Sequence, residues 1–154
     1  MPFTFGPKSL AELRGVKPQL QQLAHRALAL SVQDFSITDG LRTMAEQQEL
    51  LARGATTTLN SKHLTGDAID AVPFIGGKPR WEWPPTYHVA AAFQLAAREL
   101  GVLIRWGGVW DRTLNDMPTG AAQLEEEVNA YVARRRRLGR RAFIDGPHFE
   151  LKVD

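Results

Sequence analysis

Cysteine is absent from this chain of 154 residues. Its absence excludes disulfide bonds, cysteine nucleophiles and thiolate metal ligands, and it leaves the redox compartment open. No stretch approaches the roughly 20 apolar residues of a membrane-spanning helix, so we expect no transmembrane segment. The opening residues MPFTFGPKSLAEL show no charged region followed by an apolar one, so we expect synthesis in the cytoplasm without a signal peptide.

Excess charge is also small, since the formal net charge is +2. The basic residues concentrate in one run, Arg134 to Arg137 followed by Arg140 and Arg141. Glutamates at positions 125–127 precede this run in the same expected helix, and that order complements the helix macrodipole. We therefore interpret the run as a solvated helix end, with a binding patch as the alternative, and we expect no specific nucleic-acid partner.

The length and the composition, with 44% hydrophobic and 23% charged residues, are those of one soluble globular domain spanning residues 1–154. Capping boxes, prolines and apolar stripes at helical spacing predict five helices. The signals are a capping box from Ser9 to Glu12, a helix from Pro18 to about Leu30, a capping box from Thr43 to Glu46 with a helix to about Ala52, and the stripes Val89, Phe93, Ala96, Ala97, Leu100 and Ala121, Leu124, Val128, Tyr131, Val132.

Short segments of β-forming or alternating residues predict strands between these helices. Glycine, proline and hydroxyl residues mark the stretches ATTTLNSKHLTG, GGKPRWEWPP and GGVWDRTLNDMPTG as loops. The result is an α+β domain whose strand order cannot be deduced from these patterns. The expected strands are Asp34–Thr38, Ala68–Val72, Val102–Trp106 and His148–Val153.

Histidine occurs only four times, at His25, His63, His88 and His148. In a chain without thiolates, zinc is held by imidazole nitrogen and carboxylate oxygen, and a catalytic site uses three such ligands and leaves one position for water. His63 and His148 lie in polar segments that contain glycine, SKHLTGDAID and DGPHFEL. We interpret these two as metal ligands and the other two as hydrogen-bonded structural residues.

Asp70 is the third candidate ligand, seven positions after His63 and inside an apolar strand. A buried carboxylate needs a partner, and either a metal cation or an arginine would serve. Gly66 lets the intervening loop bend back toward the strand. If the strand that begins at His148 lies beside the strand of Asp70, all three side chains face one ion.

The same segments resemble a known family. SKHLTGDAID matches the Ser-x-His-x-x-Gly-x-Ala-x-Asp signature, and DGPHFEL matches the acid-x-x-His-Phe-Glu signature, of zinc D-alanyl-D-alanine carboxypeptidases and phage L-alanyl-D-glutamate endopeptidases. DGLRTMAEQ and RWGG resemble two further segments of that family, and all four occur in the family's order. The resemblance implies a Hedgehog/D-Ala-D-Ala-peptidase-like fold, a small antiparallel sheet with packed helices.

The resemblance also implies roles for individual residues. His63, Asp70 and His148 are expected to hold one zinc ion. Asp145 is expected to be the general base that accepts a proton from the attacking water. Arg42 is expected to contact the substrate and stabilise the charged oxygen of the tetrahedral intermediate, and Ser61 is a further candidate for substrate contact.

Each of these residues has a structural alternative. Asp145 can be a turn residue before Gly-Pro, Arg42 a surface residue at a helix start, and Ser61 a residue that closes a loop. Glu150 either orients a ligand histidine or lies on the strand surface.

Two other groups of residues suggest substrate contacts. Of the four tryptophans, Trp106 and Trp110 lie near the matched segments and are the better candidates to line a substrate groove, whereas Trp81 and Trp83 can simply cover an edge. If the arginine run binds a partner, an anionic wall polymer or lipid headgroup suits a lytic enzyme best.

The resemblance implies a zinc-dependent peptidoglycan endopeptidase of the phage endolysin type. It would cut the L-alanyl-D-glutamate bond of the stem peptide, act as a monomer, and reach the cell wall from the host cytoplasm after release. A D-alanyl-D-alanine carboxypeptidase is the enzymatic alternative. A non-catalytic zinc-binding or wall-binding module is the alternative from another class.

Overall fold

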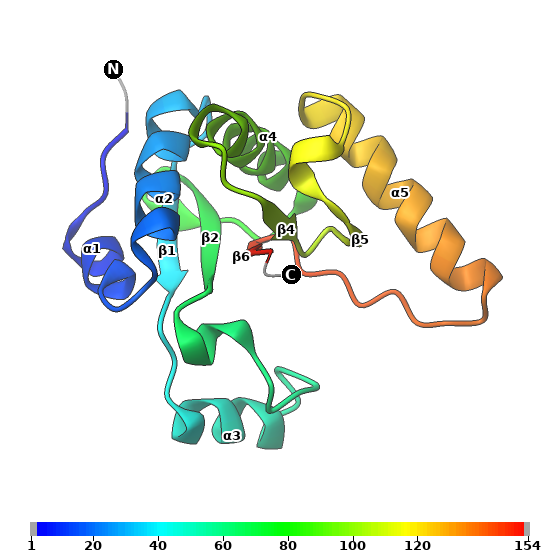
Figure 1. Cartoon of the computed structure of the whole chain (residues 1–154), viewed down its shortest axis with the longest axis horizontal. Helices are drawn as coiled ribbons and strands as arrows, with labels where there is room; N and C mark the ends of the chain where they lie inside the picture. The colour runs from blue at the N-terminus through cyan, green and yellow to red at the C-terminus, as the bar shows by residue number, and fades with distance from the viewer. Residues whose placement is uncertain (1–2, 153–154) are drawn as a thin grey trace.

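An antiparallel sheet forms the centre of the computed structural model, which describes residues 3–152 (Figure 1). Its order is β1-β2-β6-β4-β5, and β3 pairs with the far end of β2. The last strand in the sequence therefore lies in the middle of the sheet, between β2 and β4. The strands are β1 (Phe35–Asp39), β2 (Ala68–Ile75), β3 (Lys78–Pro79), β4 (Ile104–Trp106), β5 (Val109–Thr113) and β6 (His148–Leu151).

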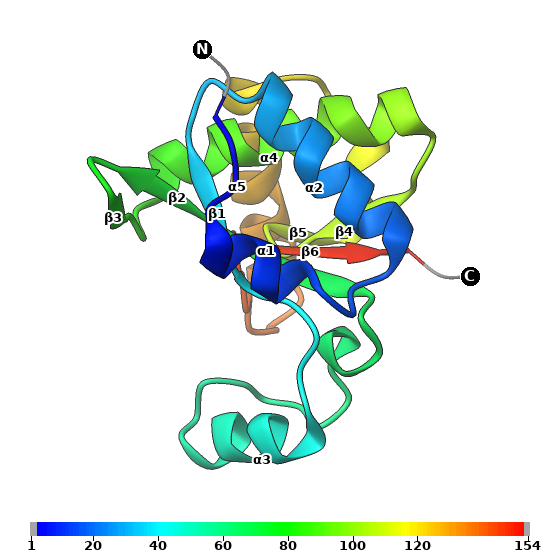
Figure 2. The same cartoon turned by 90° about the vertical axis from the view of Figure 1, so that its left-hand side faces the viewer.

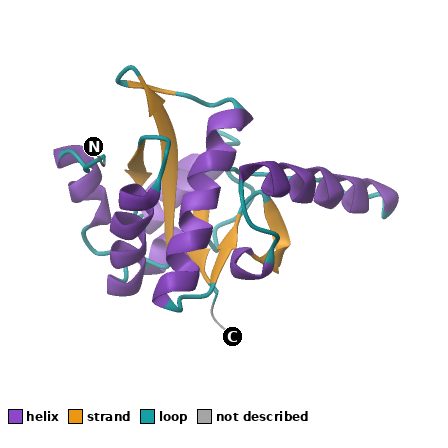
Figure 3. Ribbon diagram, turned by 90° about the horizontal axis from the view of Figure 1, so that it is seen from above, coloured by secondary structure: helices purple, strands orange, loops and turns teal. Residues whose placement is uncertain are grey.

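Helices cover one face of this sheet, and a smaller helical unit lies on its other side. Viewed from above, α2 and α4 lie over the strands, and α5 extends sideways from them (Figure 3). Figure 2 shows α3 and the following short helix below the sheet, away from α2 and α4. The helices are α1 (Pro7–Leu13), α2 (Pro18–Leu30), α3 (Met44–Ala52), α4 (Trp83–Leu100) and α5 (Ala121–Arg137), with the 3-10 helices η1 (Lys62–Thr65) and η2 (Leu114–Asp116).

The two central strands alternate between the helical core and the opposite face. Ile69 and Phe149 are fully buried in the core. The ring of Phe149 stacks on that of Phe93, with 4.0 Å between the ring centroids. Burying each such side chain contributes about 1.5–3 kcal/mol, so the strands are fixed to the helices by their apolar face. Asp70 and His148, one position along each strand, therefore point away from this core.

The start of the chain differs from the expectation at Ser9. The N-cap of α1 is Gly6, because Pro7 suits the first position of a helix, and no capping box forms at Ser9. The Ser9 hydroxyl instead accepts a hydrogen bond from the backbone N–H of Ile37 at 3.0 Å, which joins α1 to β1. The second expected capping box, from Thr43 to Glu46, is present in full.

All three expected loops contain regular structure, which in the first of them is the 3-10 helix η1. Gly76–Gly77 make the turn between β2 and β3, and α4 begins at Trp83 with prolines in its first turn. Gly107–Gly108 join β4 to β5 in a hairpin, where only a loop was expected. Gly-Gly between two runs is a hairpin signal.

Leu100, expected on the apolar stripe of α4, is 41% exposed. Val153, expected in the last strand, lies outside the described residues. Among residues 3–152, no helix is long and apolar enough to cross a membrane.

Candidate metal centre

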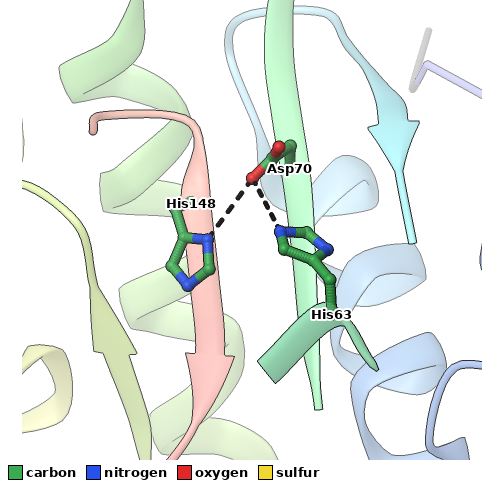
Figure 4. A group of neighbouring side chains, drawn as sticks. All are labelled: His63, Asp70 and His148. Carbon is green, nitrogen blue, oxygen red and sulfur yellow. Dashed lines mark ion pairs between the residues drawn. The ribbon is translucent and has the colours of Figure 1, made fainter. Parts of the chain in front are cut away.

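Three chain segments bring His63, Asp70 and His148 together (Figure 4). Asp70 on β2 is directly opposite His148 on the neighbouring β6, so the strand register places both side chains on the same face. His63 comes from η1, which ends at Gly66 in the left-handed conformation with φ 74°. A side chain at Gly66 would also meet the carbonyl oxygen of Gly15 at 2.6 Å, so only glycine allows this turn into β2.

The nitrogen and oxygen atoms of the three residues point at a common position. Asp70 Oδ1 lies 3.3 Å from Nε2 of His63 and 3.5 Å from Nδ1 of His148. All three atoms lie within 4.8 Å of one another. His63 is 2% exposed and His148 is 7% exposed, so two imidazole rings are withdrawn from water to make this cluster.

The outward nitrogens of the two rings are held by fixed acceptors. Nδ1 of His63 is 2.9 Å from the carbonyl oxygen of Gly40, and Nε2 of His148 is 2.9 Å from Oε1 of Glu150. If each outward nitrogen donates its proton there, the inward nitrogens carry lone pairs. Glu150 therefore orients a histidine of the cluster and is not a surface strand residue, since it is 6% exposed.

This donor set fits a divalent cation. The buried Oδ1 of Asp70 has no hydrogen-bond donor, although it faces two imidazoles. Zinc binds nitrogen and oxygen at about 2.0–2.2 Å in tetrahedral sites, which separates neighbouring ligand atoms by about 3.3–3.5 Å. The 3.3 and 3.5 Å separations around Asp70 agree with that spacing, and three lone pairs facing one another need a positive charge between them.

The pKa values of these groups reflect the same crowding. Burial alone would raise the pKa of Asp70, but the contacts with His148 and His63 lower it below its ordinary value. Burial would lower the pKa of His148, but the carboxylates of Asp70 and Glu150 raise it to about 9. Without a metal, a proton on His148 supplies the positive charge that the cluster needs.

Asp145 lies beside the cluster on a tight turn that leads into β6. The turn closes with a hydrogen bond from the backbone N–H of His148 to the carbonyl oxygen of Asp145, at 3.1 Å. Gly107 allows the turn to pass, because a side chain there would meet the carbonyl oxygen of Asp145 at 2.1 Å. Trp106 donates from its indole nitrogen to the carbonyl oxygen of Gly146 at 2.7 Å. The RWGG segment therefore holds the turn that carries Asp145.

The electrostatic surroundings of Asp145 suit proton transfer. Burial and the nearby charge of Asp70 raise the pKa of Asp145, and the positive influence of His148, His63 and Arg42 opposes that rise only in part. A divalent cation held by the neighbouring cluster would lower this pKa again, so Asp145 would be ionised and able to accept a proton near neutral pH.

Arg42 and Ser61 line the same cleft as the cluster. The guanidinium of Arg42 is buried, pairs with Asp39, and donates to Oε1 of Gln47 at 2.7 Å. The hydroxyl of Ser61 accepts a hydrogen bond from the backbone N–H of His63 at 3.2 Å, so Ser61 caps η1. Arg42 is therefore fixed in direction, and Ser61 fixes the helix that carries His63.

The cleft around the cluster has a volume of about 660 Å³. Its lining includes the hydroxyl groups of Thr56–Thr58 and the aromatic side chains of Trp81, Trp110 and Phe143. The expectation for Trp106 was wrong, since this side chain is fully buried in the core.

Trp81, which is 69% exposed, was not favoured from the sequence. Trp81 lies outside the matched segments, and no local sequence pattern indicates that its side chain lines the cleft.

A cleft with two imidazoles, a convergent carboxylate, a second, half-buried acid and a fixed arginine contains the groups that a metal-assisted peptidase would use. Residues 1–124 match the family described as phage L-alanyl-D-glutamate peptidase, and the chain belongs to this family.

Two relatives agree with this assignment. The chain is 44% identical over 115 residues to the L-alanyl-D-glutamate peptidase of Escherichia phage T5. The aligned segment covers 72% of this chain and 84% of that protein. The crystal structure of the Serratia marcescens L-Ala D-Glu endopeptidase ChiX matches with a TM-score of 0.72 and 34% identity, over 97% of this chain and 90% of that one. The expected family and fold class are thus confirmed.

Proposed function

We propose that the chain is a zinc-dependent peptidoglycan endopeptidase of the endolysin type that hydrolyses the L-alanyl-D-glutamate bond of the stem peptide. The observation that carries the proposal is the convergence of His63 Nε2, Asp70 Oδ1 and His148 Nδ1 on one position beside a cleft. The named activities of the two relatives supply the bond. The enzyme would act on the cell wall after release from the host cytoplasm.

The chemistry can be assigned to residues of the cleft. Zinc, when held by His63, Asp70 and His148, would lower the pKa of the water bound to it toward neutral pH and would polarise the scissile carbonyl. Asp145 accepts the proton of the attacking water and passes it to the leaving amine. Arg42 places a fixed positive charge where the carbonyl oxygen becomes negative. Asp39 and Gln47 hold the guanidinium in that direction.

Ser61 would contact the substrate. Its oxygen already accepts the N–H of His63, and its own hydroxyl proton remains available for a substrate carbonyl. Ser61 thus joins the metal-binding turn to the substrate.

The proposal is tested by digesting purified muropeptides with the zinc-loaded protein and identifying the new termini by mass. We expect new termini at L-alanine and D-glutamate, and no cleavage by His63→Ala at the same protein concentration. Release of free D-alanine with intact L-alanyl-D-glutamate bonds would instead indicate the carboxypeptidase. Zinc binding without any cleavage would indicate the non-catalytic module.

A further inference from the structure

Four arginine side chains at the end of α5 have no structural partner among residues 3–152. Arg136, Arg137, Arg140 and Arg141 are all exposed, and none of their guanidinium groups makes an ion pair or hydrogen bond within that part of the chain. We call these four residues the arginine patch. Arg134, earlier in the run, pairs with Asp111 at 3.0 Å and is not part of it.

The backbone holds the arginine patch together. The N–H of Gly139 donates to the carbonyl oxygen of Arg136 at 3.0 Å, and the N–H of Arg140 donates to that of Arg135 at 2.8 Å. These two bonds are those of a Schellman motif, which turns the chain back at a helix end. Nε of Arg135 also donates to the carbonyl oxygen of Arg141 at 3.0 Å. The four charges are therefore gathered on one ordered turn.

This turn lies beyond the part of α5 that packs on the protein. The buried residues of α5 are Leu124, Val128 and Tyr131, and the helix continues to Arg137. In Figure 1 the end of α5 lies away from the body, and the chain then returns toward β6. The last turns gain no core burial, and neighbouring like charges repel, so packing does not explain them. The helix macrodipole offsets only part of that repulsion.

One end of the arginine patch, at Arg141, lies near the cleft. Phe143 lines the cleft, and its carbonyl oxygen accepts a hydrogen bond from the indole nitrogen of Trp110 at 2.7 Å. Arg141 is two residues before Phe143, so their Cα atoms are separated by at most about 7 Å. A polymer that occupies the cleft can therefore reach the patch without leaving the surface.

We propose that the arginine patch binds free carboxylates of the peptidoglycan around the stem peptide being cut. This inference rests on the proposed function. A glutamate linked through one carboxyl group keeps its other carboxylate, and stem peptides repeat along the wall, so the wall is a polyanion. Guanidinium groups bind carboxylates through paired hydrogen bonds. Continuity with the cleft favours the wall over a lipid surface, which would not place a peptide between the cleft walls.

The test measures binding of the chelator-treated protein to insoluble peptidoglycan sacculi by sedimentation, so that no cleavage occurs. The patch variant replaces Arg136, Arg137, Arg140 and Arg141 with glutamine. The matched control replaces four exposed basic residues that do not line the cleft with glutamine, which changes the net charge equally. These control positions are Lys8, Arg14, Lys17 and Lys78.

We expect the patch variant to bind at least about tenfold more weakly, and the control to bind like the wild type. Binding of the wild type should weaken with added salt. It should also weaken, by as much as in the patch variant, when the wall carboxylates are converted to amides. On a soluble muropeptide the patch variant should keep its kcat. Cleavage of the soluble muropeptide also separates this inference from the proposed function. If the wild type does not cleave it, the proposed activity is refuted, but the measured binding to sacculi still tests the arginine patch.

Three outcomes would overturn the inference. One is equal binding of the patch variant and the control. Another is undiminished binding to amidated sacculi. The third is patch-dependent binding to anionic phospholipid vesicles or duplex DNA in place of sacculi.

Discussion

Removal of the Glu150 side chain should weaken metal binding although Glu150 is not expected to touch the metal. Its Oε1 is 2.9 Å from Nε2 of His148, and its Oε2 is 3.5 Å from Nζ of Lys62. The carboxylate therefore fixes both the direction of the His148 ring and which nitrogen carries the proton. In Glu150→Ala, the ring can rotate and protonate at the nitrogen that faces Asp70.

The size of the effect follows from this one contact. A hydrogen bond to a charged group contributes about 1.5–3 kcal/mol, which corresponds to a factor of about 10–100 in zinc affinity. Partners that orient metal-bound histidines have effects of the same size. Glu150→Gln keeps an oxygen acceptor near His148 and should lose less. Lys62 then lacks its charge partner in both variants, so the difference between them isolates the orientation of His148.

The assay is competition for zinc between the protein and a chromophoric chelator at pH 7.5. Glu99→Gln serves as the control, since Glu99 forms an exposed ion pair with Arg26 far along the chain from the cluster. Such exposed pairs contribute about 0–1 kcal/mol. Wild-type zinc affinity in a folded Glu150→Ala protein would refute the argument that Glu150 orients His148.

Further predictions concern the acid, the arginine and the metal-free protein. Asp145→Ala should retain zinc by metal analysis but cleave muropeptides about 100-fold or more slowly; normal turnover would remove its assignment as the base. Arg42→Ala should lower turnover about 100-fold to 1,000-fold, and a change in KM alone would exclude its role at the charged oxygen. In the metal-free protein the raised pKa of His148, about 9 against an ordinary 6.5, stabilises the fold fully below pH 6.5. That stability, up to about 3 kcal/mol, should be lost as the pH rises from 6.5 to 9, and a melting temperature that stays constant or rises over this range would contradict it. Zinc at 100 times its Kd should add about 2.7 kcal/mol of stability, seen as a higher melting temperature that chelator reverses.

The sequence predicted the cluster because its geometry is mostly local. His63 and Asp70 are joined by a short segment in which Gly66 sets the turn, and alternation alone puts His148 on a definite strand face. The pairing of β2 with β6 was the one long-range assumption, and the register of Asp70 with His148 confirms it.

Features that depend on distant segments could not be predicted in this way. The position of β6 in the middle of the sheet arises from pairing with β2 and β4, which no local pattern encodes. Trp106 resembled a groove residue because it adjoins a matched segment, but its place on β4 puts it in the core. Trp81 lines the cleft only because the connection from β3 to α4, in which it lies, passes beside the cleft.

The central claim is most directly tested by a crystal structure of the zinc-loaded protein with anomalous diffraction measured at the zinc absorption edge. We expect one anomalous peak about 2.0–2.2 Å from Nε2 of His63, a carboxylate oxygen of Asp70 and Nδ1 of His148, with a remaining position open toward the cleft. A peak elsewhere, or one bound through Nε2 of His148, would contradict the ligand set from which the proposed reaction is argued.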